Sequence, residues 1–232
     1  MQFPVHVPVG PWQVHPHIVF EALGYTLGFQ LFLLLRRRRG EPLAPGQRPV
    51  LVLAAVAGAL VGSKLLAWLV DPAALWAHRA DWRAWVEGKT IVGGLLGGHL
   101  SVAWAKHHLG VARSTGDLYA LPLAVGIAVG RIGCFLTGLG DRTYGVATAL
   151  PWGVDFGDGV HRHPTPLYEL AFLAVLALLL WRRMRHPWAE GHLFRLFMAS
   201  YLGWRLLVGF IQPDATLLGL SAIQWACVAG LC

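Results

Sequence analysis

The 232-residue sequence has few charged residues and few cysteines, and both shortages exclude common classes of protein. Charged residues make up 13% of the chain, against about 25% in soluble globular domains, so the polar surface of a soluble enzyme is missing. Three cysteines, all in or beside apolar runs, indicate neither a disulfide framework nor a zinc site, and we expect no metal and no cofactor. They are Cys134, Cys227 and Cys232.

The start of the chain also lacks the features of a cleavable signal peptide. Residues Met1–His17 are rich in Pro, Val and His, with no basic region and no small-residue cleavage site before the first apolar run. We therefore expect the first apolar segment to be retained as a helix.

What the sequence does contain is a series of seven apolar runs, in a chain that is 56% hydrophobic. Each run approaches the length that crosses about 30 Å of hydrocarbon at about 1.5 Å per residue. We predict an all-α polytopic membrane protein, with seven transmembrane helices in a single membrane-embedded domain over residues 1–232. The predicted spans are Ile18–Leu35, Val50–Val70, Thr90–Ala105, Leu118–Leu136, Pro166–Trp181, Leu193–Phe210 and Leu217–Leu231.

The basic residues favour one orientation of these spans. The net charge of +7 does not point to nucleic acid, because most Lys and Arg residues lie in the gaps between apolar runs. The loops on one side of the predicted spans carry ten of these residues and the loops on the other side carry five. The side with ten is expected in the cytoplasm. The amino terminus and the outer loops 71–89 and 137–165 then face outward, and the carboxyl terminus is cytoplasmic. The ten are Arg36, Arg37, Arg38, Arg39, Arg48, Lys106, Arg113, Arg182, Arg183 and Arg185; the five are Arg79, Arg83, Lys89, Arg142 and Arg162.

Glycine pairs at four-residue spacing recur in the spans. Such pairs let helix backbones approach closely, so packing is the ordinary interpretation. The doubled pair in the third span leaves a broad face without side chains that could equally accommodate a lipid chain. The pairs are Gly58/Gly62, Gly93/Gly97, Gly94/Gly98 and Gly126/Gly130.

Six ionisable residues fall inside the predicted spans. A charge at mid-bilayer costs at least about 2.5 kcal/mol and normally has a partner or a cavity. They either form internal ion pairs, for example Arg131 with Glu169, or mark a functional site. The six are Glu21, Lys64, His99, Arg131, Glu169 and Arg205.

Two of these residues, Arg131 and Arg205, have the chemistry of a phosphate site. Guanidinium is permanently charged and forms paired hydrogen bonds to phosphate oxygens, which lysine cannot reproduce. Tyr201 lies four residues before Arg205 and so shares its helix face. The pattern favours a phospholipid headgroup, although a carboxylate substrate would be bound by the same geometry.

The loop before the fifth span places further polar residues at a helix entrance. Pro166 fits the first turn of that helix, with His163 before it and Glu169 just inside. A histidine there can act as a base or headgroup ligand, or can simply bond the loop. Asp141, earlier in the same outer loop, is a further candidate.

At these residues the sequence resembles the prolipoprotein diacylglyceryl transferase family. The order and spacing of the matching segments agree over nearly the whole chain, as do the seven spans and the outward amino terminus. The matching segments are Val92–Gly97 (VGGLLG), Gly130–Gly138 (GRIGCFLTG), Arg162–Glu169 (RHPTPLYE), Tyr201–Arg205 (YLGWR) and Gln212–Ala215 (QPDA); the family has Asn or Cys at the position of Cys134.

The resemblance implies a multi-pass enzyme of the bacterial inner membrane that moves diacylglyceryl from phosphatidylglycerol to the lipobox cysteine of a preprolipoprotein signal peptide, on the periplasmic side. We predict catalytic roles for Arg205, Tyr201, His163, Glu169 and His99, and substrate binding by Arg131, Gly93, Gly94 and Asp141.

The sequence differs from the family at positions whose residues would act as acids or bases. Val92 stands in place of an essential histidine, Glu21 stands in a segment that usually carries a His-Trp-Tyr cluster, and Gly209 replaces a glutamate. His99 returns to nearly the same helix face as Val92 but about 10 Å deeper. Asp141, Glu21 and His163 are alternative bases.

Three functions therefore remain open at the level of sequence. The first is a divergent transferase that uses another base or another acceptor. The second is a catalytically inactive paralogue that binds phospholipid or a lipoprotein precursor as an accessory protein. The third is a small transporter or channel, which would explain the intramembrane charge but lacks inverted repeats.

Overall fold

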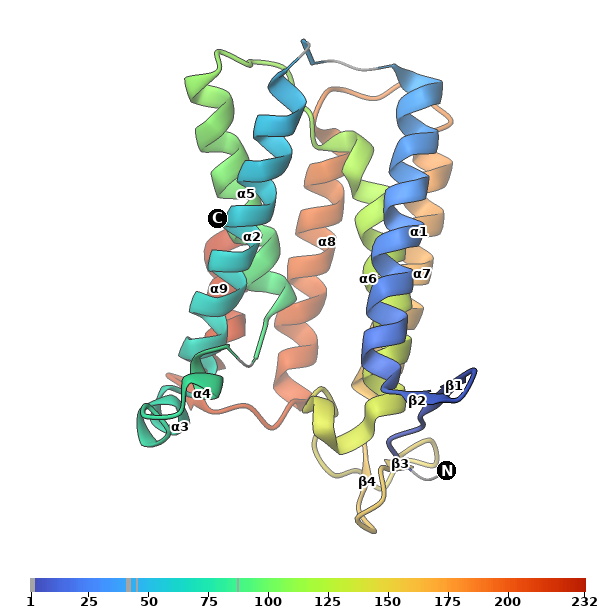
Figure 1. Ribbon diagram of the computed structural model, residues 1–232, viewed down its shortest axis with the longest axis vertical. Coiled ribbons are helices and arrows are strands. Elements are labelled where there is room, and N and C mark those ends of the chain that lie inside the picture. Colours follow the sequence, from blue (N-terminus) through green and yellow to red (C-terminus); the bar gives the residue numbers. More distant parts are fainter. Residues whose placement is uncertain (1–2, 41–42, 45, 87) are drawn as a thin grey trace. The chain divides into compact units, whose positions relative to one another are not determined.

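A computed structural model describes residues 3–40, 43–44, 46–86 and 88–232, and helices dominate it (Figure 1). Six of the predicted spans coincide closely with a helix of the structure, and the seventh coincides in part. Glu87, in the predicted outer loop 71–89, lies outside the described residues. The helices are α1 Pro16–Arg39, α2 Gln47–Val70, α3 Pro72–Ala77, α4 Trp82–Val86, α5 Ile91–His108, α6 Asp117–Thr137, α7 Thr165–Arg183, α8 His192–Val208 and α9 Ala222–Leu231, with 3-10 helices η1 Gly138–Asp141 and η2 Gly209–Ile211.

Three short antiparallel hairpins lie among the helices. They pair β1 (Val7–Val9) with β2 (Trp12–Val14), β3 (Val154–Asp155) with β4 (His161–Arg162), and β5 (Thr216–Leu217) with β6 (Leu220–Ser221).

The last hairpin makes the predicted seventh span wrong at its beginning. Leu218 and Gly219 have φ of 55° and 83°, a left-handed backbone that a right-handed helix cannot include. Helix α9 begins only at Ala222, where Ser221 accepts from the backbone of Gln224 and the Gln224 side chain accepts in return, a capping box.

Five segments of the described chain are long and apolar enough to cross a membrane. They are Pro16–Arg39, Gln47–Val70, Asp117–Asp141, Thr165–Arg183 and His192–Ile211. Helix α9, with 10 residues, extends about 15 Å, half of the hydrocarbon thickness. The protein is therefore a mostly helical membrane protein with five candidate spans, and the predicted α5 and α9 spans are not among them.

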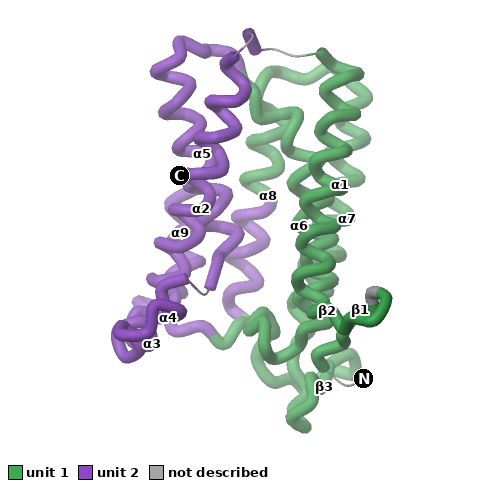
Figure 2. Tube along the Cα trace, viewed as in Figure 1, with its two compact units in different colours: residues 1–41, 114–200, 211–213 green, residues 42–113, 201–210, 214–232 purple. Residues whose placement is uncertain are grey.

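The chain divides into two compact units, each built from separate segments (Figure 2). Unit 1 comprises residues 1–41, 114–200 and 211–213 and contains α1, α6 and α7; unit 2 comprises residues 42–113, 201–210 and 214–232 and contains α2, α5 and α9. Helix α8 contributes to both, because its residues from Tyr201 onward belong to unit 2. Fully buried apolar side chains include Leu173 and Phe197 in unit 1, and Leu202 and Cys227 in unit 2.

Glycines allow the closest helix contacts in both units. A Cβ on Gly97 of α5 would lie 2.3 Å from the carbonyl oxygen of Gly58 on α2, and one on Gly62 would lie 2.4 Å from that of Gly93. In unit 1, a Cβ on Gly24 of α1 would lie 2.6 Å from the carbonyl oxygen of Gly126 on α6. The packing interpretation of these glycines is confirmed. Gly130 differs, because nothing lies within 4 Å of the position of its Cβ.

The close contact of Gly97 with the α2 backbone predicts a stability difference between two glycine variants of unit 2. Gly97→Ala places a methyl group against the α2 backbone, where neither side can yield, so we expect a loss of about 1–3 kcal/mol of unfolding free energy. Gly203→Ala on α8 is the matched control, since a Cβ there meets nothing within 4 Å. Thermal unfolding in detergent should show a lower midpoint for Gly97→Ala alone; equal midpoints would contradict the close α2–α5 contact.

Candidate functional site

Arg131 and Glu169 form a buried ion pair in unit 1. The Nη2 atom of Arg131 on α6 lies 2.9 Å from Oε1 of Glu169 on α7, and the two residues are 6% and 2% exposed. The pairing predicted for these residues is confirmed. Since a charge of either sign is costly to bury alone, each holds the other in place. The pair fixes a guanidinium near the carboxyl end of α6.

His163 is held by its backbone at the entrance to α7. Its carbonyl accepts from the N–H of Gly145 at 2.9 Å, and its N–H donates to the carbonyl of Val146 at 3.1 Å. A Cβ on Gly145 would lie 2.7 Å from the Cβ of His163. The missing side chain at Gly145 therefore gives the histidine its position.

The ring of His163 is oriented by a short hydrogen-bonded chain. Nε1–H of Trp152 donates to the Tyr168 hydroxyl at 2.8 Å, and that hydroxyl lies 3.2 Å from Nδ1 of His163. Because the indole can only donate, the proton of Tyr168 is available for Nδ1. When the hydroxyl donates to Nδ1, Nε2 carries the ring proton and His163 presents a donor there. Sequence reasoning missed Trp152 and Tyr168 as partners, although Tyr168 lies in the RHPTPLYE segment.

The preceding loop is ordered by two carboxylates outside the membrane spans. Asp155 accepts from the backbone N–H groups of Gly157, Asp158 and Gly159 at 2.8, 3.1 and 3.0 Å, and these bonds, that of Gly157 foremost, lower its pKa. Paired hydrogen bonds from Arg162 at 2.7 and 2.8 Å lower the pKa of Asp158. This stabilisation is therefore present above the ordinary carboxyl pKa and is lost as the pH falls through the lowered values.

In unit 2, Tyr201 and Arg205 are both buried, as their predicted common face requires. Tyr201 is 0% and Arg205 6% exposed. Burial raises the pKa of the Asp214 carboxyl in the QPDA segment, while the positive charge of Arg205 acts in the opposite direction. The guanidinium is thus held inside unit 2 with its charge acting on Asp214.

The glycine that replaces the family glutamate has a packing reason. A Cβ on Gly209 would lie 2.7 Å from Cγ of Gln224. Gln224 is 1% exposed, and its amide donates to the carbonyl of Leu206 at 3.0 Å. A glutamate at position 209 would therefore displace the residue that caps α9.

The remaining predicted residues lie on α5 in unit 2. Val92 is 1% exposed, whereas His99 is exposed, so their side chains have different surroundings despite the seven-residue spacing. A Cβ on Gly93 would lie 2.3 Å from the carbonyl oxygen of Gly62, while one on Gly94 would make only ordinary contacts, the nearest at 3.6 Å. α2 therefore covers Gly93, and substrate binding by either glycine stays a prediction.

The predicted site residues are divided between the units. Unit 1 contains Arg131, Glu169, His163 and Asp141, and unit 2 contains Gly93, Gly94, His99, Tyr201 and Arg205. Within unit 1 the structure brings Arg131 to Glu169, and Asp141 to a residue that the sequence did not single out, His17, at 2.9 Å.

Comparison with known proteins decides the family. The family model for prolipoprotein diacylglyceryl transferase matches residues 4–232. The chain belongs to the prolipoprotein diacylglyceryl transferase family. Three relatives, each named phosphatidylglycerol–prolipoprotein diacylglyceryl transferase, cover most of its length. That of Bordetella parapertussis is 32% identical over 94% of this chain and 86% of its own; that of Geobacter sulfurreducens is 33% identical over 96% and 88%; that of Methylococcus capsulatus is 32% identical over 96% and 86%.

The resemblance found in the sequence is thus confirmed over nearly the whole chain. This member of the transferase family has Arg131 and Arg205 in its matching segments, and it has Val92 and Gly209 where the resemblance implies a histidine and a glutamate. Its structure gives these two positions buried, packed surroundings.

Proposed function

We propose that this protein transfers diacylglyceryl from phosphatidylglycerol to the lipobox cysteine of a preprolipoprotein. The observation that carries the proposal is the buried Arg131–Glu169 pair, in a chain whose relatives are named for this reaction. A guanidinium fixed in this way is a preorganised cation for a phosphate that becomes a leaving group.

The reaction is a substitution at a glycerol carbon. The cysteine sulfur forms a C–S thioether bond, the C–O bond to the phosphate breaks, and glycerol phosphate leaves with the bonding electrons. A base takes the thiol proton, and cations stabilise the departing phosphate. Arg131 and Arg205 suit the second task, since each can form two parallel hydrogen bonds to phosphate oxygens.

The other site residues take roles that follow from their contacts. Glu169 positions Arg131, and His163 donates through Nε2 to a phosphate oxygen, because its Nδ1 faces Tyr168. Tyr201 is buried one turn before Arg205 on the same face of α8, and we infer from that position that it orders the guanidinium. With His163 serving as a donor, Asp141 and Glu21 are the leading candidates for the base.

His99, Gly93 and Gly94 have proposed roles within unit 2. The side chain of His99 is exposed on the surface of α5, so a lipid substrate could reach its ring. Gly93 and Gly94 would shape the path of an acyl chain along the same helix.

The proposed membrane arrangement has seven spans in the bacterial inner membrane. α5 and α9 join the five longer segments, the amino terminus lies outside and the carboxyl terminus in the cytoplasm. The excess of Lys and Arg in alternate connections supports this orientation. The site then faces the periplasm, where a preprolipoprotein signal peptide presents its lipobox.

Purified protein with phosphatidylglycerol vesicles and a lipobox peptide tests the proposal. We expect a peptide whose mass has risen by one diacylglyceryl group and an equal amount of released glycerol phosphate. A peptide with the lipobox cysteine replaced by serine is the control and should release none. Saturable lipid binding without product across a panel of thiol acceptors would instead identify an accessory lipid-binding protein.

A further inference from the structure

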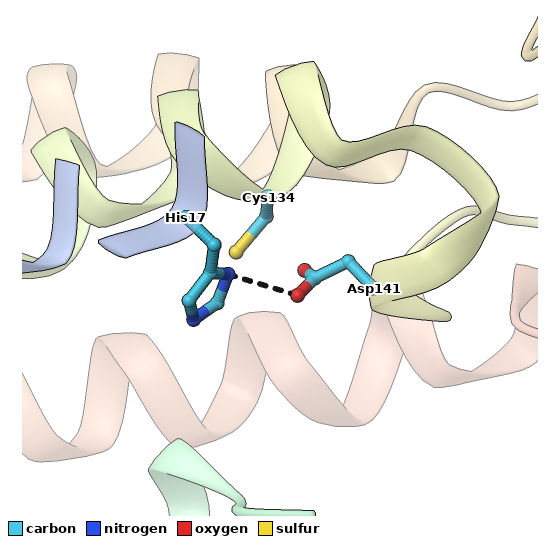
Figure 3. Close-up of side chains that lie close together, drawn as sticks. All are labelled: His17, Cys134 and Asp141. Atoms are coloured by element: carbon cyan, nitrogen blue, oxygen red, sulfur yellow. Dashed lines mark ion pairs between the residues drawn. The ribbon is translucent and has the colours of Figure 1, made fainter. Parts of the chain in front are cut away.

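Three side chains of different metal-binding chemistry meet in unit 1. They are His17 in the first turn of α1, Cys134 in the last turn of α6, and Asp141 at the end of η1. A nitrogen, a sulfur and a carboxylate oxygen from these residues all lie within 4.8 Å of one another. In Figure 3 the sulfur of Cys134 and the carboxylate of Asp141 point toward the same part of the His17 ring.

The backbone is built to bring these residues together. A Cβ on Gly133 would lie 2.9 Å from Cβ of Phe20 and 3.2 Å from Cα of His17, so the start of α1 can approach α6 only because position 133 is glycine. Gly138, with φ of 70°, ends α6 in a conformation that favours glycine. The chain then turns through η1 and returns Asp141 toward His17.

Neighbouring groups orient the ligands from behind. Nδ1 of His17 lies 2.9 Å from Oδ1 of Asp141, while Nε2 on the other side of the ring lies 3.5 Å from Oε2 of Glu21. Tyr25 donates to Glu21 at 2.9 Å, and Thr143 donates to Oδ2 of Asp141 at 3.0 Å. A carboxylate behind the second nitrogen of a histidine is the arrangement that metal-binding histidines characteristically have.

The third ligand is placed beside a positive charge. Sγ of Cys134 lies 3.6 Å from Nη1 of Arg131, which donates to it. Cys134 is 7% exposed, whereas the side chains of His17 and Asp141 are 24% and 14% exposed. The sulfur is therefore enclosed while the other two ligands keep a path to the outside.

We propose that His17, Cys134 and Asp141 bind one Zn²⁺ ion through Nδ1, Sγ and a carboxylate oxygen. The ligand atoms of a tetrahedral zinc site lie about 3.3–3.8 Å from one another. In the structure Nδ1 of His17 and Oδ1 of Asp141 are 2.9 Å apart, and all three ligand atoms lie within 4.8 Å of one another. Small side-chain rotations therefore suffice to form the site. Thiolate and imidazole select zinc over Mg²⁺ or Ca²⁺, which prefer oxygen. Binding releases the Cys134 thiol proton to solvent, and water fills the fourth position.

This site departs from the expectation that no metal is bound, and it shares Asp141 with the candidates for the transferase base. With the Asp141 carboxylate on the metal, Glu21 is the candidate base that remains. The metal site and the proposed activity are also connected through Arg131, because conversion of Cys134 to a metal-bound thiolate adds an anionic partner to the guanidinium that Glu169 already holds. Metal occupancy would therefore position Arg131.

Metal content of the full chain, purified without a polyhistidine tag from cells grown with zinc, tests the proposal. We expect about one zinc per chain by elemental analysis. After chelation, Co²⁺ should restore the site and give the absorption of a cobalt–thiolate bond, a readout that needs neither a variant nor activity.

Cys134→Asn, His17→Gln and Asp141→Asn should each lower metal affinity at least about tenfold, with the thermal midpoint measured as a check of folding. Cys134→Asn is the sharpest variant, since asparagine is the other residue that the family uses there. Cys227→Ser and Asp155→Asn are matched controls outside the cluster and should keep full occupancy. Zinc at background level and no cobalt–thiolate band would overturn the proposal, leaving His17 paired with Asp141 beside Cys134 without a metal. Full occupancy in Cys134→Asn would overturn it equally.

Discussion

Arg131→Ala should both destabilise unit 1 and abolish diacylglyceryl transfer. The variant leaves the carboxylate of Glu169, 2% exposed, buried without its arginine, and breaking such a pair costs about 3–5 kcal/mol. Transfer should fall by about 100-fold or more, because a cation aimed at the developing charge is lost. Denaturant unfolding and the peptide mass assay measure the two effects separately.

A second variant separates stability from chemistry at this pair. In Arg131→Met/Glu169→Leu both charges are replaced by apolar groups, so unfolding free energy should return close to that of the unmodified protein, while transfer stays absent. If the double variant transferred diacylglyceryl at the unmodified rate, Arg131 would have no role in the reaction.

Arg205→Ala should cause the second large loss of activity, with an expected decrease in transfer of about 100- to 1,000-fold. Arg205→Lys should recover only part of this, because an ammonium group keeps the charge but cannot form the paired hydrogen bonds of guanidinium. The initial rate of glycerol phosphate release over a range of phosphatidylglycerol concentrations measures both variants.

Arg195 provides the matched control for Arg205. It lies on the same helix, α8, but is exposed and donates to the carbonyl of Gly191. Arg195→Ala should leave the rate of transfer unchanged. An equal loss in Arg195→Ala and Arg205→Ala would mean that the effect comes from general weakening of α8 and not from a phosphate contact.

Much of this fold could be predicted because the membrane imposes simple rules on sequence. Apolar runs located the long helices to within a few residues, and glycine spacing indicated close helix packing, which the structure places between α2 and α5. The Arg131–Glu169 pair could be anticipated since a lone charge in a span is costly.

Other features could not be read from the sequence. The left-handed turn at Leu218 and Gly219 interrupts the start of an apolar run whose composition is typical of a helix, and it shortens the last helix to α9. The His17, Cys134 and Asp141 cluster joins a residue at the start of α1 to two residues at the end of α6 and in η1, far later in the chain. Only the close approach of α1 to Gly133 brings them together.

The two positions at which the sequence departs from the family motif also could not be interpreted from sequence alone. Val92 and Gly209 are departures from a family motif when seen in sequence, and in the structure each is a packed position. The base is therefore still a prediction, with Asp141, Glu21 and His163 as the candidates, and motif comparison alone does not identify it.

Growth of a conditional bacterial strain depleted of its own prolipoprotein diacylglyceryl transferase tests whether this protein transfers diacylglyceryl in cells. We expect that the unmodified chain, with valine at position 92, restores growth and thioether-modified lipoproteins, and that Arg205→Ala, present in the membrane at the same level, does neither. Failure of the unmodified chain at normal membrane abundance, with growth restored by Val92→His, would contradict this expectation.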